Sequence, residues 1–342
     1  MFENFFGHRA VTEVLHRIIA QERIPHTLLF HGPEGVGKAT LARRVGAALL
    51  GDAEKIEQDD LNRPENRERI AEREKLPSNK RSEDPLLFAT HPDFITFPPE
   101  GPLRQISIPQ MRLLKERAQF KPLKGNRRVF LIDRLDRANE QAANSLLKTL
   151  EEPPDHLILI LTAENIYDLL PTIRSRAVSF YLAPLAVEEM REFARFRELD
   201  HAERRIALAN GSPGIAVSLD LDAYDHRRAA MLSLLGAASR HTRLSRWAEY
   251  AERIGAERTE KLDSYLMVLY QLLEDVVLLA EGREEIRNAD IRDALAAVAR
   301  RVSFEWIRAA VARVDELIWM ARRNVQKSIA LDALVVELQS LA

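Results

Sequence analysis

Residues 32–39 read GPEGVGKA, and this stretch decides the fold of the chain. Gly32, Gly37 and Lys38 fall where the phosphate-binding pattern G-x-x-x-x-G-K-[ST] requires them. The last position of the pattern supplies a hydroxyl to Mg²⁺, and here it is Ala39. The sequence therefore predicts a nucleotide-type loop that can cradle phosphate but lacks one metal ligand.

The residues on either side of this loop have the expected periodicity. Residues 27–30 (TLLF) have the pattern of a short buried strand, and residues 40–50 have that of an amphipathic helix. Strand, glycine loop and helix together are the context in which a phosphate loop is expected. Thr40 carries the nearest hydroxyl, but one helical step turns it by about 100° from position 39. We assign Gly32, Gly35, Gly37, Lys38 and Thr40 to a degenerate nucleotide site.

Further strands and helices alternate along the first half of the chain. Strand patterns occur at 93–97, 127–133, 156–162 and 178–182, and helical patterns lie at 11–21, 108–114 and 139–150. Such alternation predicts an α/β domain with a parallel sheet covered on both faces.

The sequence pattern changes after Pro184 from alternating strands and helices to helices. Residues 188–197 and 201–210 have the pattern of two short helices, and every periodic segment from Asp225 onward is helical. We therefore predict a phosphate-loop NTPase domain at 1–182, a small helical domain at 183–222 and an all-helical domain at 223–342.

The segment 51–85 is dominated by charge. Of its 35 residues 19 are charged, with 11 acids and 8 bases. The excess of acids disfavours a basic arm that binds nucleic acid. This composition predicts a solvated helical excursion or a partly disordered insertion.

Composition limits the class of protein. The 342 residues are 46% apolar and 30% charged, with a net charge of −2, so nucleic-acid contact requires a local basic patch. No cysteine is present, which excludes disulfides and thiolate zinc sites. The sequence has no apolar run of membrane length and no secretory signal at its start. We expect a cytoplasmic protein that does not contact a membrane.

A second chemical feature lies at the end of the strand pattern 127–133. Asp133 ends an apolar run, which is where nucleotidases place the aspartate that holds Mg²⁺ or its waters. Many ATPases place a glutamate next to it, but here the neighbour is Arg134, which cannot act as a general base. We therefore interpret Asp133 as vestigial, and we predict no metal site.

Two motifs carry a resemblance to a known family. Residues 144–154 read NSLLKTLEEPP, and residues 170–177 follow with LPTIRSRA. Together with the run NVQKSIAL at 324–331, they resemble the clamp-loader AAA+ subunits of bacterial DNA polymerase III. The resemblance extends from Phe5 to Leu331 and therefore covers nearly the whole chain.

The resemblance implies a five-subunit ring that loads a sliding clamp on primed DNA. In this ring, 183–222 would be a helical lid domain and 223–342 a helical collar that holds the subunits together. The partners it implies are motor subunits of the gamma or tau type, a delta-type subunit, the clamp and DNA. Arg176 matches an arginine that reaches into a neighbour's ATP site, although spacing alone leaves Arg174 as a second candidate. Thr162 matches the sensor-one position, a polar group near the γ-phosphate.

Departures from the family pattern suggest that this chain does not hydrolyse ATP. Ala39 removes a ligand of Mg²⁺, Arg134 replaces the catalytic acid, and Gly214 stands where active subunits carry the sensor-two arginine. The family's four-cysteine zinc module, which would fall in 51–85, is absent, and His91 of the His-Pro-Asp motif is expected to be structural. We predict no required cofactor and no zinc, and we leave open residual binding of ATP or ADP.

Three hypotheses follow. The first is a non-hydrolysing subunit that supplies Arg176 to a neighbour, and the second is an active AAA+ ATPase, either a motor subunit or a DNA-remodelling enzyme. The third is a scaffold that neither binds nucleotide nor supplies an arginine. The arginine pairs Arg300-Arg301 and Arg322-Arg323 have a solvated helix face as their usual explanation, with DNA contact as the alternative.

Overall fold

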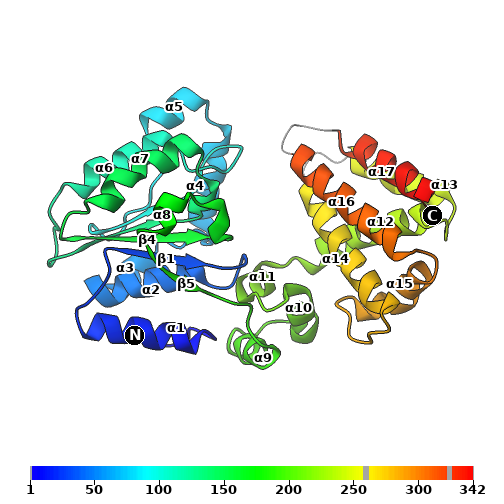
Figure 1. The fold of residues 1–342 in the computed structure, drawn as a ribbon, viewed down its shortest axis with the longest axis horizontal. Helices are drawn as coiled ribbons and strands as arrows, with labels where there is room; N and C mark the ends of the chain where they lie inside the picture. Colours follow the sequence, from blue (N-terminus) through cyan, green and yellow to red (C-terminus); the bar gives the residue numbers. More distant parts are fainter. Residues whose placement is uncertain (1, 257–261, 322–325, 342) are drawn as a thin grey trace. The chain divides into compact units, whose positions relative to one another are not determined.

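A computed structural model describes residues 2–256, 262–321 and 326–341 of the chain. The chain divides into two compact units, Met1–Val217 and Ser218–Ala342 (Figure 1). The pair Arg322-Arg323 and the first two residues of the run 324–331 lie outside the described residues. The three-domain division stays a prediction.

The first unit is built on a parallel sheet of five strands in the order β2-β3-β4-β1-β5. The strands are β1 (Thr27–His31), β2 (Phe94–Phe97), β3 (Arg128–Ile132), β4 (Leu157–Ala163) and β5 (Val178–Tyr181). Each lies within two residues of the segment predicted for it, and the predicted α/β fold is confirmed.

Helices cover both faces of this sheet, as the alternating pattern predicts. Figure 1 shows α1 (Arg9–Ala20) and α2 (Lys38–Leu50) on one side, and α6 (Ile108–Ala118) and α7 (Glu140–Glu151) on the other. Successive strand residues point to opposite faces, so the two helical layers bury two separate apolar clusters. Every residue of β4 is buried, which explains its continuous apolar run.

The register of the sheet brings chemically important residues to one edge. In β1 and β4, Phe30 pairs with Thr162 and His31 with Ala163. Since the strands are parallel, the loop after β1, Asp133 after β3 and Thr162 of β4 all lie at the carboxyl edge.

The charged segment 51–85 is helical, as the first of its two alternatives predicts. It forms α3 (Ala53–Glu57), α4 (Pro64–Lys75) and α5 (Ser78–Glu83). Ile70 of α4 packs with Leu86 and Phe88 in a small apolar cluster of its own.

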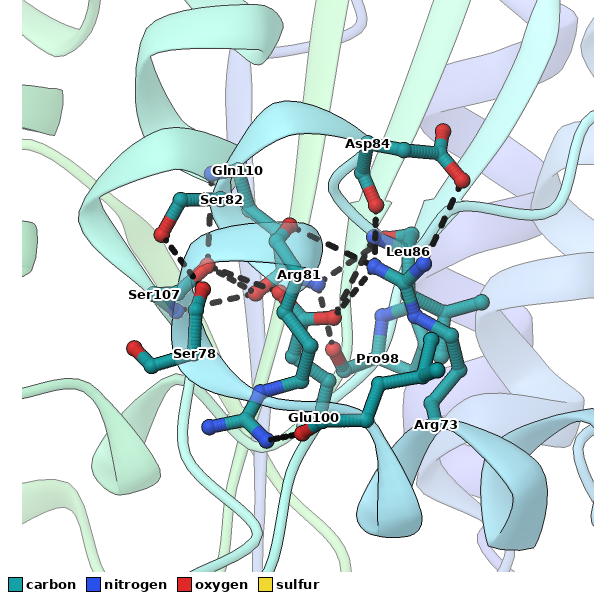
Figure 2. Close-up of polar contacts among 11 residues, drawn as sticks. Arg73, Ser78, Arg81, Ser82, Asp84, Leu86, Pro98, Glu100, Ser107 and Gln110 are labelled. Carbon is teal, nitrogen blue, oxygen red and sulfur yellow. Dashed lines mark hydrogen bonds and ion pairs between the residues drawn. The ribbon is translucent and has the colours of Figure 1, made fainter.

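Buried charges hold this segment as well. The Arg73 side chain is 9% exposed and donates to the carboxylates of Asp84 and Glu100, at 3.2 and 3.1 Å (Figure 2). Glu100 also accepts a 2.9 Å hydrogen bond from the hydroxyl of Ser107, the N-cap residue of α6.

A second residue of α6 adds to these contacts. The side-chain amide of Gln110 donates to the carbonyl oxygens of Leu86 and Pro98. These contacts tie the segment to α6, so the predicted helical excursion is not solvated throughout.

The Arg73–Glu100 pair leads to a prediction about stability. Arg73→Met would leave the buried Glu100 carboxylate without its cation, so the free energy of unfolding falls by about 3 kcal/mol. Arg67→Met, on the exposed face of the same helix, is the matched control and changes it by less than about 0.5 kcal/mol. Urea unfolding measures both, and an equal loss in the two variants would contradict the prediction.

The first unit ends in three short helices with their own apolar core. They are α9 (Val187–Phe196), α10 (Ala202–Ala209) and α11 (Pro213–Ser218), the last of which reaches the boundary between the units. Met190 and Ala216 are fully buried between these helices, in a cluster separate from the two that line the sheet.

The described part of the second unit is entirely helical, as predicted. Its long helices are α12 (Leu221–Ala238), α13 (Leu244–Ala256), α14 (Leu262–Ala280), α16 (Phe304–Ala321) and α17 (Lys327–Leu341), and the shorter α15 spans Arg292–Ala299. Trp247 and Trp306 are buried, and their indole N–H groups donate to Asp332 and to the carbonyl oxygen of Leu338. Within the described ranges, no helix is long and apolar enough to cross a membrane.

Candidate functional site

The phosphate loop lies between β1 and α2, as its sequence predicts. Gly32 has φ 146°, and a Cβ added there would lie 2.1 Å from the carbonyl oxygen of Leu182, just after β5. No other residue fits at this crossing of two chain segments. Gly37 is the N-cap residue of α2, which begins at Lys38.

The Lys38 ammonium is engaged with the loop itself. Its Nζ donates to the carbonyl oxygens of Gly32 and Pro33, at 2.7 and 2.6 Å, and the residue is 8% exposed. Burial lowers the pKa of Lys38, while the nearby carboxylates of Glu164 and Asp133 oppose that shift. Two donors that could reach a phosphate are thus directed at backbone carbonyls.

A second contact closes the loop from the side of α11. The backbone N–H of Gly214 donates to the carbonyl oxygen of Gly35 at 2.8 Å. A Cβ at Gly214 would lie 3.0 Å from the Cα and carbonyl oxygen of Gly35, and one at Gly35 would lie 2.9 Å from the backbone nitrogen of Ile215. Gly214, interpreted from the sequence as a lost arginine, therefore permits α11 to pack on the loop.

The N-terminal segment also packs against the loop, a contact that no sequence pattern predicts. A Cβ at Gly37 would lie 3.1 Å from the ring of Phe5. The imidazole Nε2 of His8 lies 3.2 Å from the carbonyl oxygen of Val36, and burial lowers the pKa of His8. Neither Phe5 nor His8 belongs to a motif, so only the tertiary structure could identify them.

Asp133 and Thr162 are direct hydrogen-bond partners. The Thr162 hydroxyl donates to Asp133 Oδ1 at 2.6 Å and accepts from the backbone N–H of Arg134 at 2.7 Å. Thr162 is fully buried, so this hydroxyl joins the ends of β3 and β4. The sequence predicted both residues at this edge but not their pairing.

Arg134 links the phosphate loop to the residue that follows β4. Its guanidinium pairs with Glu164, at 2.6 Å, and with Glu34 of the phosphate loop. Glu34 occupies a variable position of the loop pattern, and Glu164 follows β4 by one residue, so sequence reasoning missed both. The only available signal was their opposite charge to Arg134.

This edge lacks part of a Mg²⁺–nucleotide site. Ala39 has no side-chain oxygen, Asp133 Oδ1 accepts a hydrogen bond from Thr162, and the Arg134 cation pairs with Glu164 at the same edge. Thr40, the remaining hydroxyl of the predicted site, lies one residue farther along the first turn of α2. Among the described residues, no group of three or more histidines and carboxylates is arranged to hold a metal ion.

The two candidate arginines have different surroundings. Arg174 is the last residue of α8 (Pro171–Arg174), and its guanidinium lies 5.3 Å from the centre of the Tyr167 ring. Arg176, two residues farther on, is exposed and forms a 2.8 Å ion pair with Glu151, the last residue of α7. The structure therefore places Arg176 at the surface, away from the loop contacts of Lys38.

His91 has a structural environment, in agreement with its expected role. It is 1% exposed, and its Nδ1 accepts from the backbone N–H of Asp93. The buried Asp93 carboxylate accepts in turn from the backbone N–H groups of Leu123 and Lys124. The His-Pro-Asp motif therefore fastens the loop that precedes β3.

Comparison with known proteins identifies the family. The model of the family described as "DNA polymerase III, delta subunit" matches residues 7–186, which is more than half of the chain. The chain belongs to this DNA polymerase III delta family. The match covers the sheet, the phosphate loop and both candidate arginines of the family member described here.

Individual relatives agree with this assignment. DNA polymerase III subunit delta' of Pseudomonas aeruginosa is 32% identical over 60% of this chain and 59% of its own length. Subunit delta' of Bacillus subtilis is 28% identical over 66% of this chain and 63% of its own, and Escherichia coli subunit tau is 30% identical over 56% and 26%. The chain thus spans less than two thirds of these relatives.

The chain is also similar to a solved structure of low sequence identity. The gamma subunit-related protein of Thermotoga maritima is 19% identical, with a TM-score of 0.46 over 96% of this chain and 98% of that one. The strand order and the loop after β1 define the AAA+ fold of this delta-family chain.

The Thr162 hydroxyl gives a test of how this edge of the delta-family chain is stabilised. Thr162→Val keeps the shape but leaves Asp133 Oδ1 and the Arg134 N–H without this partner, so the free energy of unfolding falls by about 2 kcal/mol. Thr96→Val is the matched control, because Thr96 of β2 is 1% exposed and its hydroxyl has no hydrogen-bond partner within the described residues. We expect the control to be neutral or stabilising in urea unfolding, and a loss as large as that of Thr162→Val would refute this account.

Proposed function

We propose that the chain is a delta-prime-type subunit of the bacterial DNA polymerase III clamp loader that does not hydrolyse ATP itself. The observation that carries the proposal is a contrast between two sites. Lys38 and Glu34 of its own phosphate loop are engaged in internal contacts, whereas Arg176 is exposed just after α8. Membership of the delta family and similarity to delta', gamma and tau subunits support the clamp-loader role.

In this proposal the partners are subunits of a hetero-pentameric ring. Motor subunits of the gamma or tau type would bind and hydrolyse ATP, and a delta-type subunit would complete the ring. The sliding clamp and primed DNA would be contacted through the assembled complex, in the cytoplasm. The chain would require no cofactor of its own, and zinc has no role in it.

Arg176 would act at the ATP site of a neighbouring motor subunit. Negative charge develops on the γ-phosphoryl oxygens during transfer, and a guanidinium placed beside them stabilises that charge. Arginine suits this role because its cation persists at all relevant pH values and presents several N–H donors in one plane. The fold contributes by ending α8 close to α7, which leaves Arg176 at the surface rather than in a core.

Replacing the arginine tests this role directly. In a reconstituted ring, Arg176→Ala should lower ATP turnover at the neighbouring site about 10³-fold, so total turnover falls by the share of that site. Arg174→Ala is the control, because Arg174 contacts Tyr167, and it should leave turnover within about twofold of the wild type. Gel filtration checks that both rings assemble, and unchanged turnover with Arg176→Ala would rule out the proposed arginine role.

The purified chain alone tests the alternative of an active ATPase. We expect no hydrolysis of ATP above background with Mg²⁺, because Ala39 and Arg134 remove a metal ligand and the catalytic acid. Titration with ATP and ADP, on the wild type and on Lys38→Ala, separates residual binding from none. Turnover that Lys38→Ala abolishes would instead establish an active motor.

A further inference from the structure

Glu151 contacts the guanidinium of Arg176, the group proposed to act at the neighbour's ATP site. Its Oε1 lies 2.8 Å from Nη2 of Arg176. The other terminal nitrogen, Nη1, donates to the carbonyl oxygen of Thr172 at 2.9 Å and to the hydroxyl of Ser175 at 3.3 Å. Contacts from the ends of two helices, α7 and α8, therefore hold this side chain in one orientation.

The contacts leave part of the guanidinium available. Arginine has five N–H donors in a planar group, and these contacts engage those on Nη1 and one on Nη2. Within the described residues, Nε of Arg176 has no hydrogen-bond partner. The Nε–H and the second Nη2–H remain as donors for an incoming oxyanion.

The exposure of the pair argues against a role in stability alone. The side chains of Arg176 and Glu151 are 34% and 48% exposed, and ion pairs with this exposure contribute little to folding. Their effect on orientation is more direct. A long arginine side chain at the surface samples many rotamers, and a fixed partner removes that freedom before the phosphate is met.

We propose that Glu151 is a positioning residue for Arg176, fixing its guanidinium so that the free donors face the neighbour's ATP site. This proposal rests on the proposed function of Arg176. Glu151 acts only through the arginine and does not touch nucleotide. The adjacent acid, Glu152, is exposed and forms no ion pair with Arg176 within the described chain. Glu152 is therefore the matched control for substitutions of Glu151.

The experiment measures ATP turnover by reconstituted rings that carry variants of this chain. Turnover that is lost with Arg176→Ala defines the arginine-dependent part. Glu151→Ala should lower that part about two- to fivefold, the factor that corresponds to an exposed ion pair, with the KM for ATP unchanged. Glu151→Gln, whose amide oxygen can still accept from Nη2, should lower it less, and Glu152→Ala should not change it.

A double variant separates positioning from a general structural effect. In the Arg176→Ala background, Glu151→Ala should change turnover no further, because no guanidinium remains to be oriented. Thermal unfolding and gel filtration confirm that each variant folds and enters the ring.

Several results would overturn the proposal. They are equal turnover for Glu151→Ala and Glu152→Ala, a rise in turnover when the carboxylate is removed, or a further loss in the Arg176→Ala background. If Arg176→Ala alone has no effect, the arginine role fails and the positioning role fails with it. If Arg176→Ala lowers turnover but Glu151→Ala does not, only the positioning role is lost.

Discussion

The parallel hydrogen bonding of β1 between β4 and β5 is the constraint on which the first unit depends. With Phe30 opposite Thr162 and His31 opposite Tyr181, the chain must turn sharply after His31 to enter α2. That turn is the phosphate loop. The same register brings Asp133 and Thr162 to the loop's edge, so backbone pairing positions both residues beside the phosphate loop.

At that edge the polar groups satisfy one another. The Lys38 ammonium donates to two carbonyl oxygens of the loop, and the Thr162 hydroxyl donates to Asp133. The Arg134 guanidinium forms ion pairs with Glu34 and Glu164. A buried polar group without a partner is costly, so these internal partners stabilise this edge of the sheet. Ala39, which offers no hydroxyl to Mg²⁺, is consistent with an edge whose polar groups are paired with one another.

Much of the architecture could be predicted from periodicity, but the pairing of charges could not. Strand and helix patterns depend on local spacing, and the five strands lie close to the predicted positions. The partners Arg73–Glu100, Arg134–Glu34 and Arg176–Glu151 join residues 25 or more positions apart, which no local pattern encodes. For the same reason the segment 51–85 resembled a solvated insertion, although the burial of Arg73 makes part of its charge structural.

Gly32 and Lys38 belong to one motif, but steric crowding constrains Gly32 whereas phosphate binding is the role of the Lys38 charge. Any side chain at Gly32 would collide with the backbone of Leu182, whether or not a phosphate is ever present. Sterics alone therefore require glycine at this position, independently of any nucleotide chemistry. A scan that counts phosphate-loop glycines would respond to the crossing of two chain segments as well as to an ATP site, and the residue after the lysine is the more informative position to inspect.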